Sequence, residues 1–286
     1  MDLPPPLTRD EIAAGLEAVR AEHGPWEFHN VQLPFGLFTA GPEPRGDNHR
    51  ALKFLQLAAD TLRRPPPGLR VLDLGCGEGL YALEFGQAGA EVVAIEGRDS
   101  NLARCEFARR ALALPNVRFE KGDVREVSLA SHGRFDLILC SGILYHLDHP
   151  AAFELLKALK PMCEGGALFV DTRIASAPEV EVSFGGRSYW GSLYREHAPD
   201  ASEAQKLADT GASLDNEHSF WFTRWALANY LADLGFTSVM EALMPAPLML
   251  RADRVCLVAC AGRAARPHSE VGYDLARRRW PERYAG

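Results

Sequence analysis

The stretch Val71-Leu72-Asp73-Leu74-Gly75-Cys76-Gly77-Glu78-Gly79 decides the fold of this chain. Its apolar residues predict a buried parallel strand over 70–74. The three glycines that follow allow the backbone to turn sharply and to approach a ligand closely. A helix is expected to begin near Leu80. A strand, a glycine-rich turn and a helix in this order are typical of a nucleotide-type cofactor site.

The spacing of the glycines argues against a site for a dinucleotide cofactor. The dinucleotide fingerprint requires a third glycine at the position of Leu80, and it does not require a carboxylate such as Asp73 within the strand. NAD is therefore not the expected cofactor.

Strands and helices alternate from residue 69 onward. The expected strands cover 70–74, 91–96, 117–121, 135–140, 166–171, 237–243 and 254–260. The expected helices cover 79–88, 100–113, 150–160 and 219–234. Such alternation predicts a parallel sheet covered by helices.

Residues 1–68 are expected to form an N-terminal helical extension. Thr8 and Glu11 have the spacing of a capping box. The extension is predicted to contain a helix over 8–22, a short strand over 26–33, a turn over 34–36 and a helix over 47–62. The run Pro65-Pro66-Pro67-Gly68 marks its end, so the core domain is expected to cover 69–261.

Residues 173–218 interrupt the alternation. They are polar and lack long apolar periodicity, so they are interpreted as an inserted lid over the substrate region. Tyr189, Trp190 and Tyr194 are candidates to line an aromatic acceptor pocket there, although core packing is the commoner role of such residues. Ser219-Phe220-Trp221 are expected to begin the next helix, and 262–286 to form an Arg-rich tail.

Composition narrows the class of protein. A chain of 286 residues, 47% hydrophobic and 24% charged, predicts one large α/β domain with additions. The six cysteines lack CxxC spacing, which favours reduced thiols and a cytoplasmic protein. No leader and no membrane span is expected, because no apolar run approaches about 20 residues. A formal net charge of −7 argues against nucleic acid as the default partner.

Acidic residues follow the second and third strands of the core. Glu96 ends the second strand, where its carboxylate can accept both hydroxyls of a ribose. After the third strand, Asp123 can accept from the adenine amino group and Val124 can cover the ring. A solvated charge is the alternative for Glu96, and a β-turn residue for Asp123. The fourth strand ends at Cys140, and the carboxyl ends of such strands line the ligand crevice.

The motif VLDLGCGEG, with Glu96, Asp123 and the end of the fourth strand, resembles the class I S-adenosylmethionine (SAM) methyltransferases. This resemblance covers 69–261 and implies SAM as the cofactor. It implies an α/β, Rossmann-like sheet of seven mostly parallel strands with an antiparallel last strand. By the same resemblance, Gly75 and Gly77 border the methionine part of SAM with Asp73 behind them. Glu96 would hold the ribose, and Asp123 with Val124 the adenine.

Candidate catalytic residues follow the fourth strand. Methyl transfer from a sulfonium needs a base only when the acceptor is protonated, and a histidine suits that role. His146 is the candidate base, and Tyr145 is a candidate hydrogen-bonding partner of the acceptor or cofactor. The alternative is that this pair caps the following helix. His146, Asp148 and His149 lack a third well-placed ligand, so no metal is expected.

The class of acceptor stays open between three hypotheses. The leading one is a small molecule methylated on O or N. The segments YHLDHP, FHNVQLPFGLFTAG and SFWFT resemble a subgroup that includes the wobble-uridine tRNA carboxymethyltransferases, which makes tRNA the second hypothesis. The expected lid opposes it, since residues 173–218 contain four Lys or Arg against eight Asp or Glu. The third hypothesis is a SAM-binding module without catalytic activity. The oligomeric state and the choice between SAM and carboxylated SAM also remain open.

Overall fold

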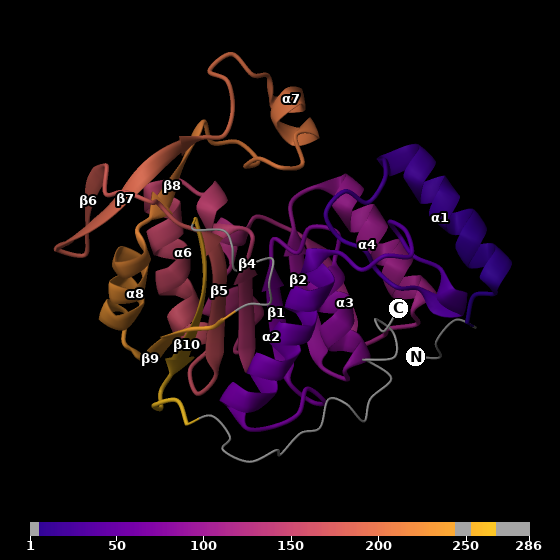
Figure 1. Cartoon of the computed structure of the whole chain (residues 1–286), viewed down its shortest axis with the longest axis horizontal. Coiled ribbons are helices and arrows are strands. Elements are labelled where there is room, and N and C mark those ends of the chain that lie inside the picture. Colours follow the sequence, from indigo (N-terminus) through magenta and orange to yellow (C-terminus); the bar gives the residue numbers. More distant parts are fainter. Residues whose placement is uncertain (1–5, 244–252, 267–286) are drawn as a thin grey trace. The chain divides into compact units, whose positions relative to one another are not determined.

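The structure is a computed structural model that describes residues 6–243 and 253–266 (Figure 1). It comprises two compact units, whose described parts are residues 6–122 with 266 and residues 123–243 with 253–265.

The first unit contains three parallel strands: β1 (Arg70–Leu74), β2 (Glu91–Glu96) and β3 (Val117–Lys121). β2 pairs with β1 on one side and with β3 on the other. Helices α3 (Leu80–Gln87) and α4 (Asp99–Ala111) pack on these strands. All three strand predictions are confirmed, because each is a short apolar run between turn signals.

The N-terminal extension packs on this unit through helices. α1 (Arg9–His23) begins at the predicted capping box and contacts α4, and α2 (Gly46–Leu62) contacts α3. The turn is a short 3₁₀ helix, η1 (Pro34–Gly36). The strand predicted over 26–33 is wrong, since this segment makes only an isolated bridge from Gln32 to Phe38. The reason is that the backbone N–H groups of 27–29 bond to a side chain, Glu78, instead of a neighbouring strand.

The second unit contains the remaining strands of the main sheet: β4 (Leu137–Ser141), β5 (Ala167–Arg173), β9 (Phe236–Glu241) and β10 (Arg254–Ala261). β4 and β5 are parallel, and the last strand, β10, runs antiparallel to both β5 and β9. Its helical elements are η2 (Val124–Glu126), α5 (Leu129–His132), η3 (Leu144–His146), α6 (His149–Met162) and α8 (Arg224–Asp233).

The segment interpreted as an insert contains regular structure that the sequence did not predict. β6 (Val180–Phe184), β7 (Arg187–Arg195) and β8 (His218–Phe222) form a separate antiparallel sheet, and α7 (Glu203–Ala208) lies between β7 and β8 in the chain (Figure 1). The helix predicted from residue 219 is wrong over 219–223. Phe220 and Phe222 alternate in β8 and pack on Phe153 of α6. α8 begins only after Thr223, whose hydroxyl accepts from Ala226 N–H.

The seven strands of the main sheet have the order β3-β2-β1-β4-β5-β10-β9. This is the predicted Rossmann-like sheet of mostly parallel strands with an antiparallel last strand. The predicted tail lies outside the described residues from 267 onward. Within 6–243 and 253–266, no helix is both long and apolar enough to span a bilayer.

Candidate active site

The glycine turn after β1 has a backbone that only glycine adopts easily. Gly75, Gly77 and Gly79 have φ angles of 60°, 56° and 84°, in the left-handed region. A Cβ at Gly79 would lie 2.9 Å from Cys105 Sγ and 3.1 Å from Phe119 Cζ. The turn therefore has no room for a side chain at Gly79.

Glu96 holds this turn through its carboxylate. Its Oε2 accepts from Gly77 N–H at 2.8 Å, and its Oε1 accepts from Arg98 N–H at 2.8 Å. Burial raises the pKa of the Glu96 carboxyl, and hydrogen bonds from these two N–H groups and from the Asn101 side chain oppose the rise. Each carboxylate oxygen has a second lone pair. The predicted diol residue is thus fixed to the glycine turn.

Asp73 is buried within β1, close to the backbone N–H of Ala82. Burial raises the pKa of its carboxyl to about 8, and the nearby charge of Glu96 adds to the rise. A hydrogen bond from the Ala82 backbone N–H opposes this rise only partly. Asp73 therefore carries a proton at neutral pH.

Glu78 ties the N-terminal extension to the glycine turn. Its buried carboxylate accepts from the backbone N–H groups of Glu27 (2.7 Å), Phe28 (3.1 Å) and His29 (2.7 Å). The buried His29 ring lies 3.6 Å from the position of a Cβ on Gly77, and its Nδ1 accepts from Leu80 N–H at 3.4 Å. Sequence reasoning missed both side chains. The one available signal was a carboxylate inside the glycine turn.

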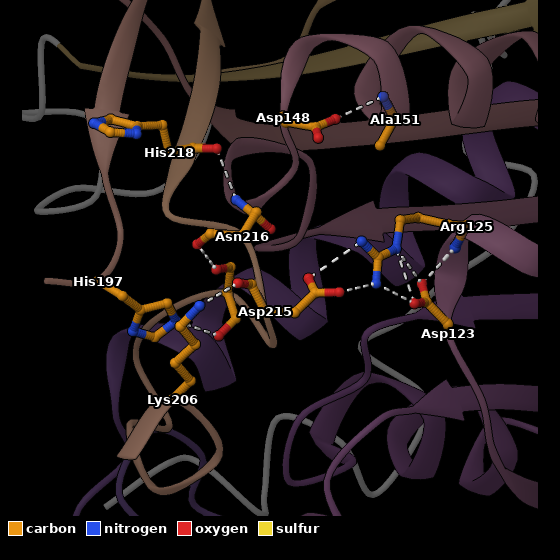
Figure 2. Close-up of polar contacts among 10 residues, drawn as sticks. Asp123, Arg125, Asp148, Ala151, His197, Lys206, Asp215, Asn216 and His218 are labelled. Carbon is orange, nitrogen blue, oxygen red and sulfur yellow. Dashed lines mark hydrogen bonds and ion pairs between the residues drawn. The ribbon is translucent and has the colours of Figure 1, made fainter. Parts of the chain in front are cut away.

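In the second unit, Asp123 is engaged by Arg125 (Figure 2). Its Oδ1 accepts from Arg125 N–H at 2.8 Å and its Oδ2 from Nε at 2.8 Å. Burial raises the pKa of Asp123, but the Arg125 hydrogen bonds outweigh it and hold that pKa below its usual value. Arg125 also makes a bidentate pair with Asp215, at 3.1 and 2.7 Å. The η2 loop is thereby joined to the segment that precedes β8.

Val124 and Cys140 are both buried, Val124 at the start of η2 and Cys140 in β4. Because the Cys140 side chain is fully enclosed, a cofactor contact at this residue would come from its main chain. Beyond β4, Gly142 N–H donates to Asp171 O at 2.9 Å, and η3 then carries Tyr145 and His146.

His146 is hydrogen-bonded to a carboxylate of the insert. Its Nδ1 lies 3.0 Å from Glu196 Oε2, and the Glu196 side chain is 1% exposed against 15% for His146. Burial raises the pKa of Glu196, but the contact with His146 outweighs it and lowers that pKa. Sequence reasoning did not single out Glu196, because it lies in a polar segment without a motif.

Aromatic residues and two arginines, Arg173 and Arg254, surround Tyr145. Trp221 Nε1 donates to Tyr145 O at 3.0 Å, and Tyr194 stacks on Trp221 at 4.6 Å. The Arg173 guanidinium lies 5.9 Å from the Tyr145 ring and 5.5 Å from the Trp221 ring. Of the three predicted aromatics, Tyr194 belongs to this group and Trp190 is exposed, whereas Tyr189 packs in the core against Phe153 and Tyr230.

Asp148 has a local role in the structure. It caps α6, since its Oδ1 accepts from Ala151 N–H at 2.9 Å (Figure 2). The described part of the chain contains no group of three or more His, Cys, Asp or Glu placed to hold a metal ion.

A family model described as a methyltransferase domain matches residues 45–241. The chain belongs to this methyltransferase family. The match spans more than half of the chain, and it includes the glycine turn, Glu96, Asp123 and the η3 residues.

Named relatives and solved structures agree with this assignment. The methyltransferase is 27% identical over 186 residues to a ubiquinone biosynthesis O-methyltransferase of Xanthomonas axonopodis pv. citri, covering 61% of this chain and 75% of the relative. It is 34% identical over 141 residues to a trans-aconitate 2-methyltransferase of Deinococcus radiodurans, covering 45% and 51%.

The N-terminal domain of EvdMO1, solved in the presence of SAH and D-fucose, resembles the methyltransferase with a TM-score of 0.67. The two are 25% identical, and the match covers 90% of this chain and 98% of that domain. Sequence family and structural neighbours together identify a class I SAM-dependent methyltransferase.

Proposed function

We propose that this methyltransferase transfers a methyl group from SAM to an O or N acceptor on a small molecule in the cytoplasm. The observation that carries the proposal is the Glu96 carboxylate bonded to Gly77 N–H, at the end of β2. A buried carboxylate held beside a glycine turn is an acceptor that suits a neutral diol on a nucleoside.

The cofactor residues are proposed to act as follows. Gly75 and Gly77 border the methionine part of SAM, with Asp73 behind them as a neutral carboxyl. Glu96 accepts from the ribose hydroxyls. Asp123, Val124 and the main chain of Cys140 are proposed to contact the adenine end, and in that case Asp123 does so while it remains paired with Arg125.

The acceptor is proposed to bind in the second unit, at the group formed by Tyr145, Tyr194, Trp221 and Arg173. Flat aromatic rings beside a guanidinium favour a planar acceptor. Two kinds of relative, named for ubiquinone biosynthesis and for trans-aconitate, support a small molecule. Residues 173–218 are proposed to cover the acceptor, and their acidic balance opposes a nucleic acid.

The chemistry requires alignment and exclusion of water more than acid catalysis. SAM supplies an activated methyl group when it is bound. Tyr145 is proposed to hydrogen-bond the acceptor, and His146 to remove its proton where it carries one.

Calorimetric titration with SAM and SAH tests the cofactor assignment. Hydrogen bonds to a charged group contribute about 1.5–3 kcal/mol each, so Glu96→Gln should weaken binding about 10- to 100-fold. Glu91→Gln, at the exposed start of the same strand, is the matched control and should bind as the wild type does. Equal affinities of all three proteins would refute the role of Glu96. A subsequent screen with labelled SAM compares hydroxyl, amine and carboxylate acceptors with undermodified tRNA.

A further inference from the structure

We propose that Glu196 is a positioning residue that fixes His146 as a base for a hydroxyl acceptor. This inference rests on the proposed function and adds to it both a residue and a substrate class. It implies that the acceptor is a phenol or an alcohol and not a carboxylate.

The hydrogen bond with Glu196 determines which nitrogen of His146 carries the proton. Glu196 Oε2 lies 3.0 Å from Nδ1, and a carboxylate can only accept, so Nδ1 is the donor. His146 Nε2 makes no hydrogen bond within the described residues and is left as the basic nitrogen. A carboxylate that bonds one ring nitrogen is the standard means of selecting a histidine tautomer.

The contacts of the Glu196 side chain determine the charge of its carboxyl group. Its side chain is almost completely enclosed, yet the contact with His146 holds its pKa below the usual value. The same Oε2 accepts from Ser213 N–H at 2.9 Å, and the Ser219 hydroxyl also lowers the pKa of this carboxyl. The carboxylate is therefore ionised at neutral pH, and His146 is its main partner.

Hydrogen bonds around the Glu196 carboxylate limit its movement. Glu196 directly follows β7, and the loop that contains Ser213 is braced from several sides. His197 Nε2 bonds Ser213 O at 2.9 Å, and Ser213 Oγ donates to Asn216 O at 2.8 Å. Asn216 in turn donates to His218 O at 2.8 Å, as Figure 2 shows. These contacts hold the carboxylate in place when the imidazole becomes charged.

The pair of His146 and Glu196 suits the removal of a proton from a hydroxyl group that is being methylated. His146 Nε2 takes the proton of the acceptor hydroxyl, and the hydroxyl oxygen bonds to the methyl carbon of the donor. The carbon–sulfur bond breaks and its electron pair stays on sulfur, so the sulfonium becomes a neutral thioether. The proton remains on His146 as an imidazolium paired with Glu196. A carboxylate acceptor has no proton to lose and would not need this pair.

Nuclear magnetic resonance of ¹⁵N-histidine-labelled protein tests the tautomer without any acceptor or donor. The His146 signals are assigned from their loss in His146→Asn. We expect the wild type to carry its proton on Nδ1 at a pH where the ring is neutral, and Glu196→Leu, which removes the acceptor, to lose this preference. Glu203→Gln, an exposed glutamate of the same insert, is the control. A proton on Nε2 in the wild type, or an unchanged tautomer in Glu196→Leu, would overturn the proposal.

Turnover with labelled SAM tests the consequence, on a panel of phenols, alcohols and carboxylic acids. We expect the product on a hydroxyl, a kcat lower by about 10²- to 10⁴-fold in Glu196→Gln, and a KM within about threefold. Glu196→Asp should recover part of kcat, since it keeps the charge. Methylation of carboxylic acids alone, or unchanged kcat in Glu196→Gln, would refute the inference. Loss of SAM binding by the wild type would instead refute the proposed function.

Discussion

Replacement of Glu78 by alanine should loosen the N-terminal extension from the glycine turn. The Glu78 carboxylate is buried and accepts three N–H groups from consecutive residues, Glu27, Phe28 and His29. The variant leaves these three donors without their acceptor. It also leaves a void next to the turn that Glu96 holds.

The magnitude follows from this geometry. A hydrogen bond to a charged group contributes about 1.5–3 kcal/mol, and three bonds to one carboxylate are less than additive. We expect Glu78→Ala to lower the free energy of unfolding by about 3–6 kcal/mol. At about 2–4 °C per kcal/mol, the melting temperature should fall by roughly 10–20 °C. Glu78→Gln keeps one oxygen acceptor, so its effect should be smaller.

Two measurements separate this effect from a general loss of stability. Urea unfolding gives the free energy, and hydrogen exchange under native conditions reports the amides of 27, 28 and 29 individually. In Glu78→Ala these amides should exchange faster than those of β1, whereas Glu22→Gln, an exposed change in α1, should alter neither. Unchanged protection of the three amides in Glu78→Ala would refute the reasoning.

Three further predictions concern the turn, the loop after β3 and pH. Gly79→Ala should lower the free energy of unfolding by about 1–3 kcal/mol, because φ is 84° and a Cβ would contact Cys105. Thermal unfolding measures this loss, and an unchanged melting temperature would contradict the prediction. Asp215→Asn should weaken the bidentate pair with Arg125 and speed proteolysis before β8 by a small factor, because both side chains are partly exposed. Asp73 has a raised pKa in the folded state, so its contribution to stability is full below its ordinary value of 3.8 and is lost as pH rises through about 8. Urea unfolding of Asp73→Asn should therefore show a flatter dependence on pH over that window, and an unaltered slope would contradict the assignment.

The sequence predicted the main sheet well for a physical reason. β1, β2 and β3 are short apolar runs bounded by turns, so their limits matched the structure residue by residue. β8 was not predicted, because five residues with three consecutive aromatics, Phe220, Trp221 and Phe222, have no period that separates a strand from the start of a helix. The strand predicted over 26–33 does not form, because the backbone N–H groups of 27–29 bond a side chain about 50 positions away.

The candidate site likewise contains residues that the sequence could predict and a residue that it could not. Residues of the glycine turn, Glu96 and Asp123 could be named in advance because they follow strands at fixed places in a known family pattern. Glu196 could not, since only the folded chain brings it to His146 from 50 positions away. Its polar neighbourhood in the sequence gives no indication of burial.

The hydrogen bond between His146 and Glu196 has a consequence for chimeric enzymes. His146 follows a strand of the main sheet, whereas Glu196 is part of residues 173–218. Exchange of that segment for the equivalent one of another methyltransferase, made to alter substrate choice, would also remove the anion that orients the imidazole. Engineers who graft this segment therefore need to transplant or rebuild both members of the pair, or the hybrid will bind a new acceptor and turn it over slowly.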